Sequence, residues 1–260
     1  MAELDREHRK VRQSLSLAME VQQNLLPRST PSVKGLDIAG KSVYCDETGG
    51  DYYDFLNPPK PEDDAVRAVV GDVSDHGIPS ALLMATARAF IRQRSSRSGS
   101  IAEIVTDTNR QLAADVQDSG RFMTLFYAEI DRQNNHMRWL NAGHEPAVIY
   151  DPDSDSFEEL HGAGNLPLGI SEDSQFREAK NAIAPGQIIV IATDGIREAQ
   201  NRHGNMFGKE AFEKVIRQNA AAGATEILKA VFTAVDLFQY GNKMEDDMTL
   251  MVVKVTEETA

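Results

Sequence analysis

Carboxylates stand at the ends of several apolar runs in this sequence. The runs 68–71 and 188–193 each lead into an aspartate, the run 248–253 follows two of them, and a glycine pair at 49–50 precedes two more. These aspartates are Asp51, Asp54, Asp72, Asp194, Asp246 and Asp247. A continuous apolar run predicts a strand that is buried on both faces. A carboxylate at its end therefore lies at the rim of the core, where it needs water, a partner or a cation.

The chemistry that such a set predicts is divalent metal binding. Several carboxylates that met at one rim would repel one another unless a cation neutralised them. Oxygen ligands without a His or Cys cluster favour Mg²⁺ or Mn²⁺ over zinc or copper. Two such ions, about 3.5–4 Å apart, can share a carboxylate, lower the pKa of water and clamp a phosphoryl group. Each aspartate alone could equally begin or end a turn, and the spacing leaves open whether the clusters converge.

The elements that must position these residues alternate in blocks. Pro27 ends a first helix, and tight turns join the strands that follow. The expected helices are 3–26, 80–93, 101–116, 209–220 and 225–238, and the expected strands are 36–43, 52–56, 65–70, 122–130, 137–141, 146–150, 176–183, 187–193 and 248–255. The strands 176–183 and 187–193 are expected to pair through a turn at Pro185-Gly186. Strict alternation of strand and helix is absent, so we predict an α+β fold of antiparallel sheets with helices outside.

The first helix has a heptad pattern. Its seam consists of Leu4, His8, Val11, Leu15, Ala18, Gln22 and Leu25. Three heptads are the lower limit for a coiled coil, and two seam positions are polar. The helix could lie against its own domain, or it could dimerise or relay a signal. We therefore divide the chain into a linker or regulatory helix, 1–27, and one domain, 28–260.

Composition excludes several classes of protein. The 260 residues include 27 Lys and Arg against 40 Asp and Glu, so the formal net charge is −13, which argues against binding the nucleic-acid backbone. A single cysteine, Cys45, excludes an internal disulfide framework and a Cys-rich zinc site. The charged segment 1–10 has no apolar region of a secretory signal, and no apolar run is long enough for a membrane span. A cytoplasmic protein is expected.

Several motifs occur together and in order. They are Gly49-Gly50-Asp51-Tyr52-Tyr53-Asp54, Val70-Gly71-Asp72-Val73-Ser74-Asp75-His76-Gly77, Asn141-Ala142-Gly143-His144, Leu166-Pro167-Leu168-Gly169-Ile170, Thr193-Asp194-Gly195 and Asp246-Asp247-Met248-Thr249. This set resembles that of the SpoIIE/RsbU-like branch of the PPM (protein phosphatase 2C type) metal-dependent serine/threonine phosphatases. The segment 21–27 resembles the linker helix that precedes the catalytic domain in that branch.

The resemblance implies a fold, a reaction and a ligand set. The fold would be a four-layer α-β-β-α sandwich of two antiparallel sheets, and the reaction would be hydrolysis of phosphoserine or phosphothreonine by water activated between two Mn²⁺ or Mg²⁺ ions. Asp72 would bridge the metals, and Val73 would offer its backbone carbonyl. Asp194 and Asp246 would bind the second metal, with Asp247 as the alternative to Asp246. Asp51 would coordinate directly or hold water on a metal.

Other polar residues near these motifs have less definite roles. His76 could protonate the leaving serine oxygen, or it could be an exposed turn residue before Gly77. His144 is expected to be structural. Asp75 stands where the family usually has a small residue, and Asp118 is a weak candidate for a third metal. No residues are assigned to substrate binding, although Arg88 and Arg121 are candidates for contacting phosphate.

The branch also implies partners. Its usual substrate is a serine-phosphorylated STAS-domain protein, an anti-sigma factor antagonist in bacterial partner switching or stress signalling. A sensor or receiver domain, or a separate activator, would act through the N-terminal helix, and the chain could form a homodimer. The alternative is a catalytically silent or resting-state binding module of the same fold. A two-metal nuclease would fit the carboxylates but not the acidic charge.

Overall fold

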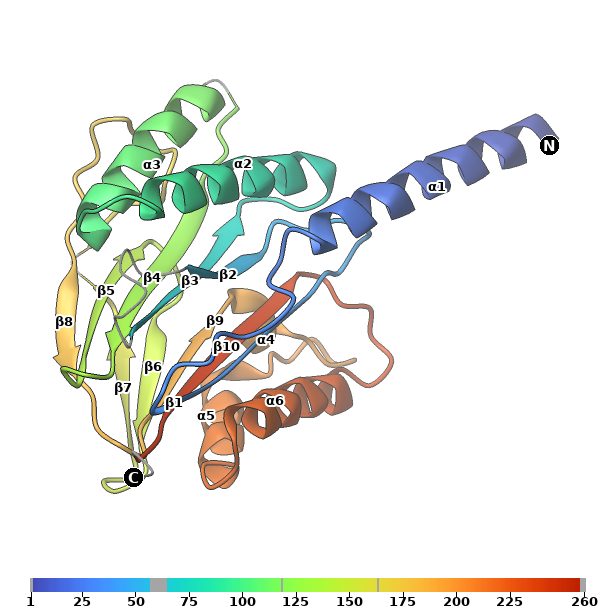
Figure 1. The fold of residues 1–260 in the computed structure, drawn as a ribbon. Coiled ribbons are helices and arrows are strands. Elements are labelled where there is room, and N and C mark those ends of the chain that lie inside the picture. Colours follow the sequence, from blue (N-terminus) through green and yellow to red (C-terminus); the bar gives the residue numbers. More distant parts are fainter. Residues whose placement is uncertain (1, 57–64, 118, 163, 258–260) are drawn as a thin grey trace.

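The computed structural model describes residues 2–56, 65–117, 119–162 and 164–257 and shows a layered fold (Figure 1). The helices are α1 (Ala2–Gln23), α2 (Ile78–Ser95), α3 (Ile101–Val116), α4 (Asp194–Glu198), α5 (Gly208–Gln218) and α6 (Ala224–Gln239). The strands are β1 (Leu36–Val43), β2 (Tyr52–Leu56), β3 (Ala65–Val73), β4 (Met123–Asp131), β5 (His136–Ala142), β6 (Ala147–Asp151), β7 (Ser156–Leu160), β8 (Ala179–Ala182), β9 (Ile188–Ala192) and β10 (Met248–Val255).

The strands form two antiparallel sheets. One sheet has the order β1-β10-β9-β6-β7 and the other the order β2-β3-β4-β5-β8. Helices α2 and α3 cover the outer face of the second sheet, and α5 and α6 cover that of the first (Figure 1). The predicted four-layer α-β-β-α sandwich is therefore confirmed.

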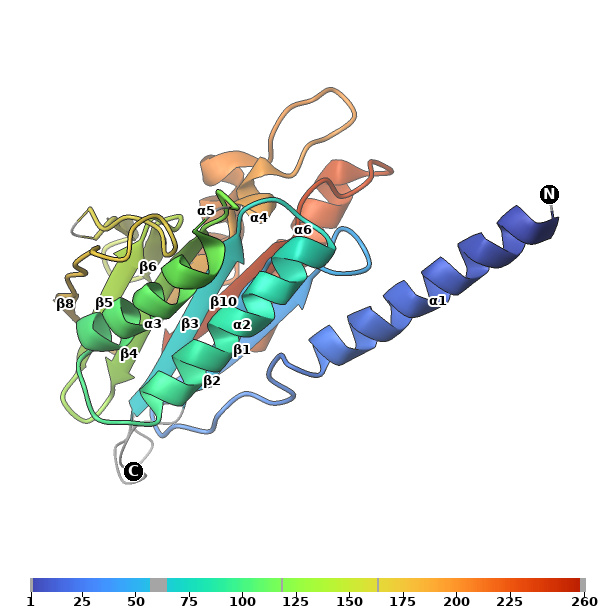
Figure 2. The same ribbon diagram turned by 90° about the horizontal axis from the view of Figure 1, so that it is seen from above.

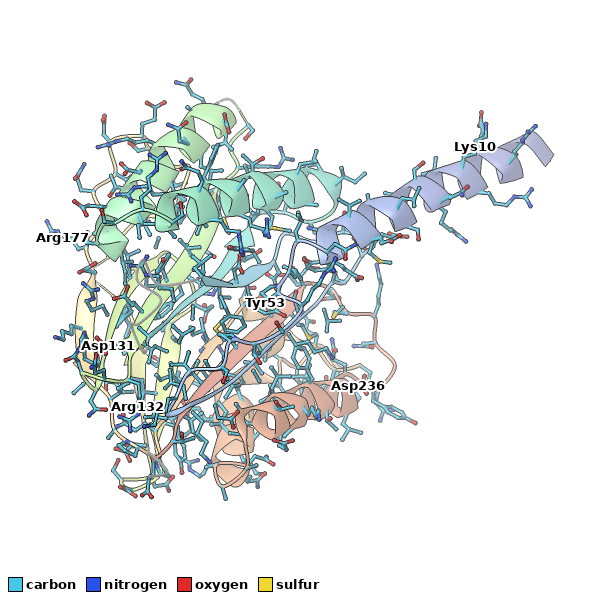
Figure 3. All side chains as sticks on the ribbon, in the orientation of Figure 1. Lys10, Tyr53, Asp131, Arg132, Arg177 and Asp236 are labelled. Carbon is cyan, nitrogen blue, oxygen red and sulfur yellow. The ribbon has the colours of Figure 1, made fainter. Side chains whose placement is uncertain are left out.

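The hydrophobic core has three layers that follow from this arrangement. The layer between the sheets includes Tyr53 (Figure 3) and the stacked rings of Phe126 and Trp139, whose centroids are 5.5 Å apart. The other two layers lie between each sheet and its helices. All five residues of β9 are buried, as the apolar run 188–192 predicted. Only a strand covered on both faces can bury such a run.

Three local predictions differ from the structure. The segments 176–183 and 187–193 do not pair, because β8 joins β5 in one sheet while β9 lies between β10 and β6 in the other. The turn at 185–186 thus passes from sheet to sheet, which alternation alone does not reveal. Strand β7 was missed because its exposed, charged sequence is that of an edge strand, and α4 because it has only five residues.

Helix α1 projects away from the sandwich (Figures 1 and 2), and Lys10 lies on its outer part (Figure 3). Val11, Leu17 and Val21 are 59%, 57% and 64% exposed, whereas the side chain of Gln22 is buried against the domain. The helix therefore contacts the body through its C-terminal end. Among the helices that the structure describes, none is long and apolar enough to cross a membrane.

Candidate metal centre

The predicted carboxylates come together at one end of the two sheets. Asp51 precedes β2, Asp194 begins α4 directly after β9, and the pair at 246–247 precedes β10. Asp72 differs slightly from the prediction, since β3 continues to Val73 and Asp72 pairs with Thr124 of β4 inside the ladder. Its backbone is therefore held by the sheet, whereas a carboxylate after the strand would lie on a loop.

Asp51 is almost completely buried, at 1% exposure. The hydroxyl of Thr193 donates to its Oδ2 at 2.9 Å. Burial raises the pKa of Asp51 well above the ordinary value, and the neighbouring charge of Asp72 raises it further. A buried carboxylate with a raised pKa is a group that a cation would stabilise.

The turn before Asp51 packs tightly against the end of β3. A Cβ on Gly50 would lie 2.7 Å from the carbonyl oxygen of Val73, so only glycine allows this approach. The N–H of Val73 donates to the carbonyl of Gly50 at 3.4 Å. The predicted carbonyl ligand and the Asp51 turn are therefore adjacent.

Asp72 lies within the electrostatic reach of the other carboxylates. Burial raises its pKa to about 8, and the charges of Asp194, Asp246 and Asp247 contribute in the same direction. The pKa of Asp246 is also raised, first by burial and then by Asp194 and other acidic neighbours. Mutual repulsion of this kind shows that the carboxylates converge, which the sequence left open.

The structure distinguishes the two adjacent aspartates that precede β10. Asp247 is buried, and its oxygens accept hydrogen bonds from the backbone N–H groups of Cys45 and Gly50, both at 2.8 Å, and of Asp51 at 3.5 Å. Asp246 is exposed as a residue although its carboxylate is partly desolvated, and its Oδ1 accepts from the N–H of Asp247. Asp247 is thus engaged in holding the loop at 45–51, and Asp246 has the freer carboxylate.

Helix α4 brings Asp194 close to this pair. A Cβ on Gly195 would lie 2.0 Å from the carbonyl oxygen of Asp247, so the start of α4 lies directly against the turn at 246–247. Glycine at this position lets the backbone of the two segments meet. In the Thr193-Asp194-Gly195 motif, Asp194 is therefore the candidate ligand, and Gly195 allows the start of α4 to lie against the backbone of Asp247.

The chemistry of the donor set fits a divalent cation. The set consists of carboxylates and the backbone carbonyl of Val73, and the carboxylates repel one another when no cation is present. Within the described residues, however, no three His, Cys, Asp or Glu side chains are already arranged as a group that could hold a metal ion. The carboxylates are gathered without being aligned as ligands.

Other predicted residues lie at the edge of this centre or outside it. His76 is 63% exposed, and its Nδ1 lies 3.1 Å from Oδ2 of Asp46. Asp54 is buried, and its Oδ2 lies 2.5 Å from Nη1 of Arg92 and 3.9 Å from Nε of Arg88, both on α2. This carboxylate therefore forms ion pairs with α2, and Arg88 has an acidic partner within the protein.

Two further acidic candidates have separate outcomes. The carboxylate of Asp75 lies 3.7 Å from Nε of Arg121, so this arginine has an acidic partner at the rim. Asp118 falls outside the described residues.

Sequence reasoning missed the contact between α1 and the centre. The side-chain amide of Gln22 donates to the carbonyl of Gly49 at 2.6 Å, and its Oε1 accepts from the N–H of Gly49 at 3.1 Å. The polarity of Gln22, one of the two polar residues on the seam, was the available signal. The contact places α1 two residues from Asp51.

Comparisons with known proteins agree with this architecture. Residues 62–256 match the family model described as Stage II sporulation protein E (SpoIIE). Phosphoserine phosphatase RsbU of Bacillus subtilis (strain 168) is 28% identical over 244 residues, which cover 94% of this chain and 70% of the relative. The structure of the SiaA-PP2C domain of Pseudomonas aeruginosa has a TM-score of 0.80 and 25% identity and covers 95% of this chain and 98% of that chain. The structure of the RsbU and RsbW domains of Rv1364c from Mycobacterium tuberculosis has a TM-score of 0.75 and 25% identity. This match covers 91% of the present chain and 64% of the Rv1364c chain.

Proposed function

Because the chain belongs to the SpoIIE family, as its motifs predicted, we propose that it is a metal-dependent protein phosphatase that hydrolyses phosphoserine. The observation that carries this proposal is the convergence of carboxylates at one end of both sheets, where Thr193 contacts Asp51 and the start of α4 lies against the turn at 246–247. The phosphoserine phosphatase RsbU, which aligns with nearly the whole chain, supports the same reaction.

In this proposal Asp72 and Asp246 hold two Mn²⁺ or Mg²⁺ ions together with Asp194, and Asp51 and the Val73 carbonyl complete the set. When bound, these cations activate water and neutralise charge on the phosphoryl group. Thr193 orients the Asp51 carboxylate through its hydroxyl. Asp247 holds the loop at 45–51 in place by accepting its backbone N–H groups.

His76 is the proposed proton donor to the leaving serine oxygen. Its Nδ1 faces Asp46, which leaves Nε2 on the opposite side of the ring for proton transfer. A change of His76 to Gln should lower kcat about 10²-fold and remove the ionisation of an acid from the pH profile of kcat. If the profile and kcat stay as in the wild type, His76 is only a residue of the exposed turn.

The proposed substrate is a STAS-domain protein phosphorylated on serine, in a bacterial partner-switching pathway. The test is release of phosphate from such a protein with Mn²⁺ and with EDTA. We expect turnover in Mn²⁺, none in EDTA, and none for Asp72→Ala. The matched control is Asp173→Asn, because Asp173 is exposed and is not one of the proposed ligands. Absence of Mn²⁺ and Mg²⁺ binding in the wild type would refute the proposal.

A resting state of the same enzyme is the second candidate. It is favoured by the contact of α1 with the metal centre, since Gln22 holds both backbone groups of Gly49 in the turn that precedes Asp51. We propose that α1 controls the position of this turn. In this case phosphatase activity would be low until an upstream domain or a separate activator displaced or fixed α1.

The same helix is the proposed dimer contact. Leu17 and Val21 of α1 and Leu82 of α2 are more than half exposed, and an apolar hollow of about 330 Å³ separates the two helices. Exposed apolar surface of this kind marks an interaction site. We expect residues 1–260 to sediment as a dimer at tens of micromolar and Val21→Lys to shift them to monomer. A monomeric wild type at that concentration would refute dimerisation through α1.

A further inference from the structure

His144 is buried in the turn between β5 and β6, and its backbone is fixed on both sides by one residue. The N–H of His144 donates to Oδ1 of Asn141 at 2.8 Å, and its carbonyl accepts from Nδ2 of Asn141 at 2.9 Å. Gly143 has φ 69°, and a Cβ there would lie 2.5 Å from the ring of Pro167. The Asn-Ala-Gly-His motif therefore builds a closed turn that sets the position of the imidazole.

The imidazole is linked to the strand that carries Asp72. Nδ1 of His144 lies 2.8 Å from the hydroxyl of Thr124, and that hydroxyl donates to the carbonyl of Asp72 at 3.4 Å. Thr124 is also the residue that pairs with Asp72 across β3 and β4. Because the hydroxyl of Thr124 donates to Asp72, it accepts from the ring when Nδ1 carries the proton, and Nε2 is then a buried acceptor without a hydrogen-bond partner among the described residues.

The ring is electrically neutral in this position. Burial lowers the pKa of His144 to about 3, and the charge of Arg197 lowers it further. Arg197 belongs to α4, the helix that begins at Asp194. His144 thus lies between the segments that present two of the proposed ligands, without contributing charge of its own.

We propose that His144 is a positioning residue, which acts through Thr124 to hold the peptide of Asp72 so that the carboxylate faces the cations. This rests on the proposed function. His144 itself contacts neither a carboxylate nor the substrate. Its role corresponds to that of groups behind metal ligands in other proteins, whose loss costs about 10–100-fold in metal affinity or activity.

The test compares His144→Ala, His144→Asn, Thr124→Val and the double variant His144→Ala/Thr124→Val. Mn²⁺ affinity is measured by calorimetry on the full chain, kcat and KM on the phosphoserine substrate, and thermal unfolding on the metal-free protein. We expect Mn²⁺ affinity to fall about 10-fold or more in His144→Ala and in Thr124→Val, and kcat to fall with KM unchanged. His144→Asn should recover most of the affinity, because its amide can donate near the position of Nδ1.

The double variant decides whether the two residues act as one chain. Its affinity should be no lower than that of either single variant, whereas independent effects would multiply. Independent effects, or a lower melting temperature with unchanged Mn²⁺ affinity and kcat, would overturn the positioning role and leave a structural one. Failure of the wild type to bind Mn²⁺ or Mg²⁺ would overturn the proposed function first, so the two failures are distinguishable. If His144→Ala does not fold, Thr124→Val and His144→Asn carry the same test.

Discussion

Replacement of Asp72 by Asn should make the metal-free protein more stable, even though it removes the proposed bridging ligand. Burial destabilises the charged carboxylate of Asp72, and repulsion by Asp194, Asp246 and Asp247 adds to this effect. An amide of nearly the same shape carries no charge. The substitution therefore relieves in EDTA the repulsion that bound cations relieve in the working protein.

The size of the effect follows from the pKa of Asp72. It is about 8 in the folded chain against the ordinary value of 3.8. A pKa raised on folding lowers stability above the unfolded value, so the penalty is absent below pH 3.8 and grows up to pH 8. At about 1.36 kcal/mol for each pH unit above the ordinary value, the penalty at pH 7 is about 4 kcal/mol. Asp51 shares part of it, because its pKa is raised by Asp72. We expect a measured gain of about 2 kcal/mol, or about 4–8 °C in melting temperature.

The assay is urea unfolding of wild type and Asp72→Asn in EDTA at pH 7 and pH 5, repeated with Mn²⁺ at pH 7. The gain should shrink to less than half at pH 5, because pH 5 is much closer than pH 7 to the ordinary pKa of 3.8. Mn²⁺ at about one hundred times its Kd should stabilise the wild type by about 2.7 kcal/mol and the variant much less. Asp173→Asn should behave as wild type throughout. The reasoning is refuted if Asp72→Asn is less stable than wild type in EDTA at pH 7, or if Mn²⁺ stabilises both proteins equally.

Three further substitutions test the surroundings of the metal centre. Gln22→Ala removes both hydrogen bonds to Gly49 and should change kcat at least several-fold in kinetic assays. The control Gln23→Ala, on the exposed side of α1, should leave kcat unchanged. Equal effects of the two variants on kcat would exclude a specific role for the Gln22 contact. Asp247→Ala leaves buried backbone N–H groups unpaired and should cost about 2–4 kcal/mol in denaturant unfolding. Asp246→Ala should lower the free energy of unfolding by less than about 1 kcal/mol, but calorimetry should show Mn²⁺ binding at least 10-fold weaker. If instead Asp247→Ala weakens Mn²⁺ binding and Asp246→Ala lowers stability, the roles of the two aspartates are exchanged.

The sequence predicted the layers of the fold because their signals are local. The apolar runs that became β9 and β10 are buried on both faces, as their composition required. The partner of β9 was not predictable in this way, since a turn between two strands does not state whether they share a sheet. Four of the site aspartates could be named from strand ends, but the distinction between Asp246 and Asp247 depends on N–H groups about 200 residues away in the chain.

The contact at Gly49 connects a helix outside the sandwich to the turn that precedes Asp51. Gln22 of α1 forms hydrogen bonds with both backbone groups of Gly49, and Asp247 accepts a hydrogen bond from the N–H of Gly50. Two distant parts of the chain therefore bind adjacent residues of one turn. Hydrogen bonds of this kind tolerate only a few tenths of an ångström. A shift of α1 by about 1 Å must therefore either move the turn before Asp51 or break the contact, and displacements of that size change activity about 10²-fold in enzymes. The carboxylates that are gathered but not aligned are the group on which such a shift would act.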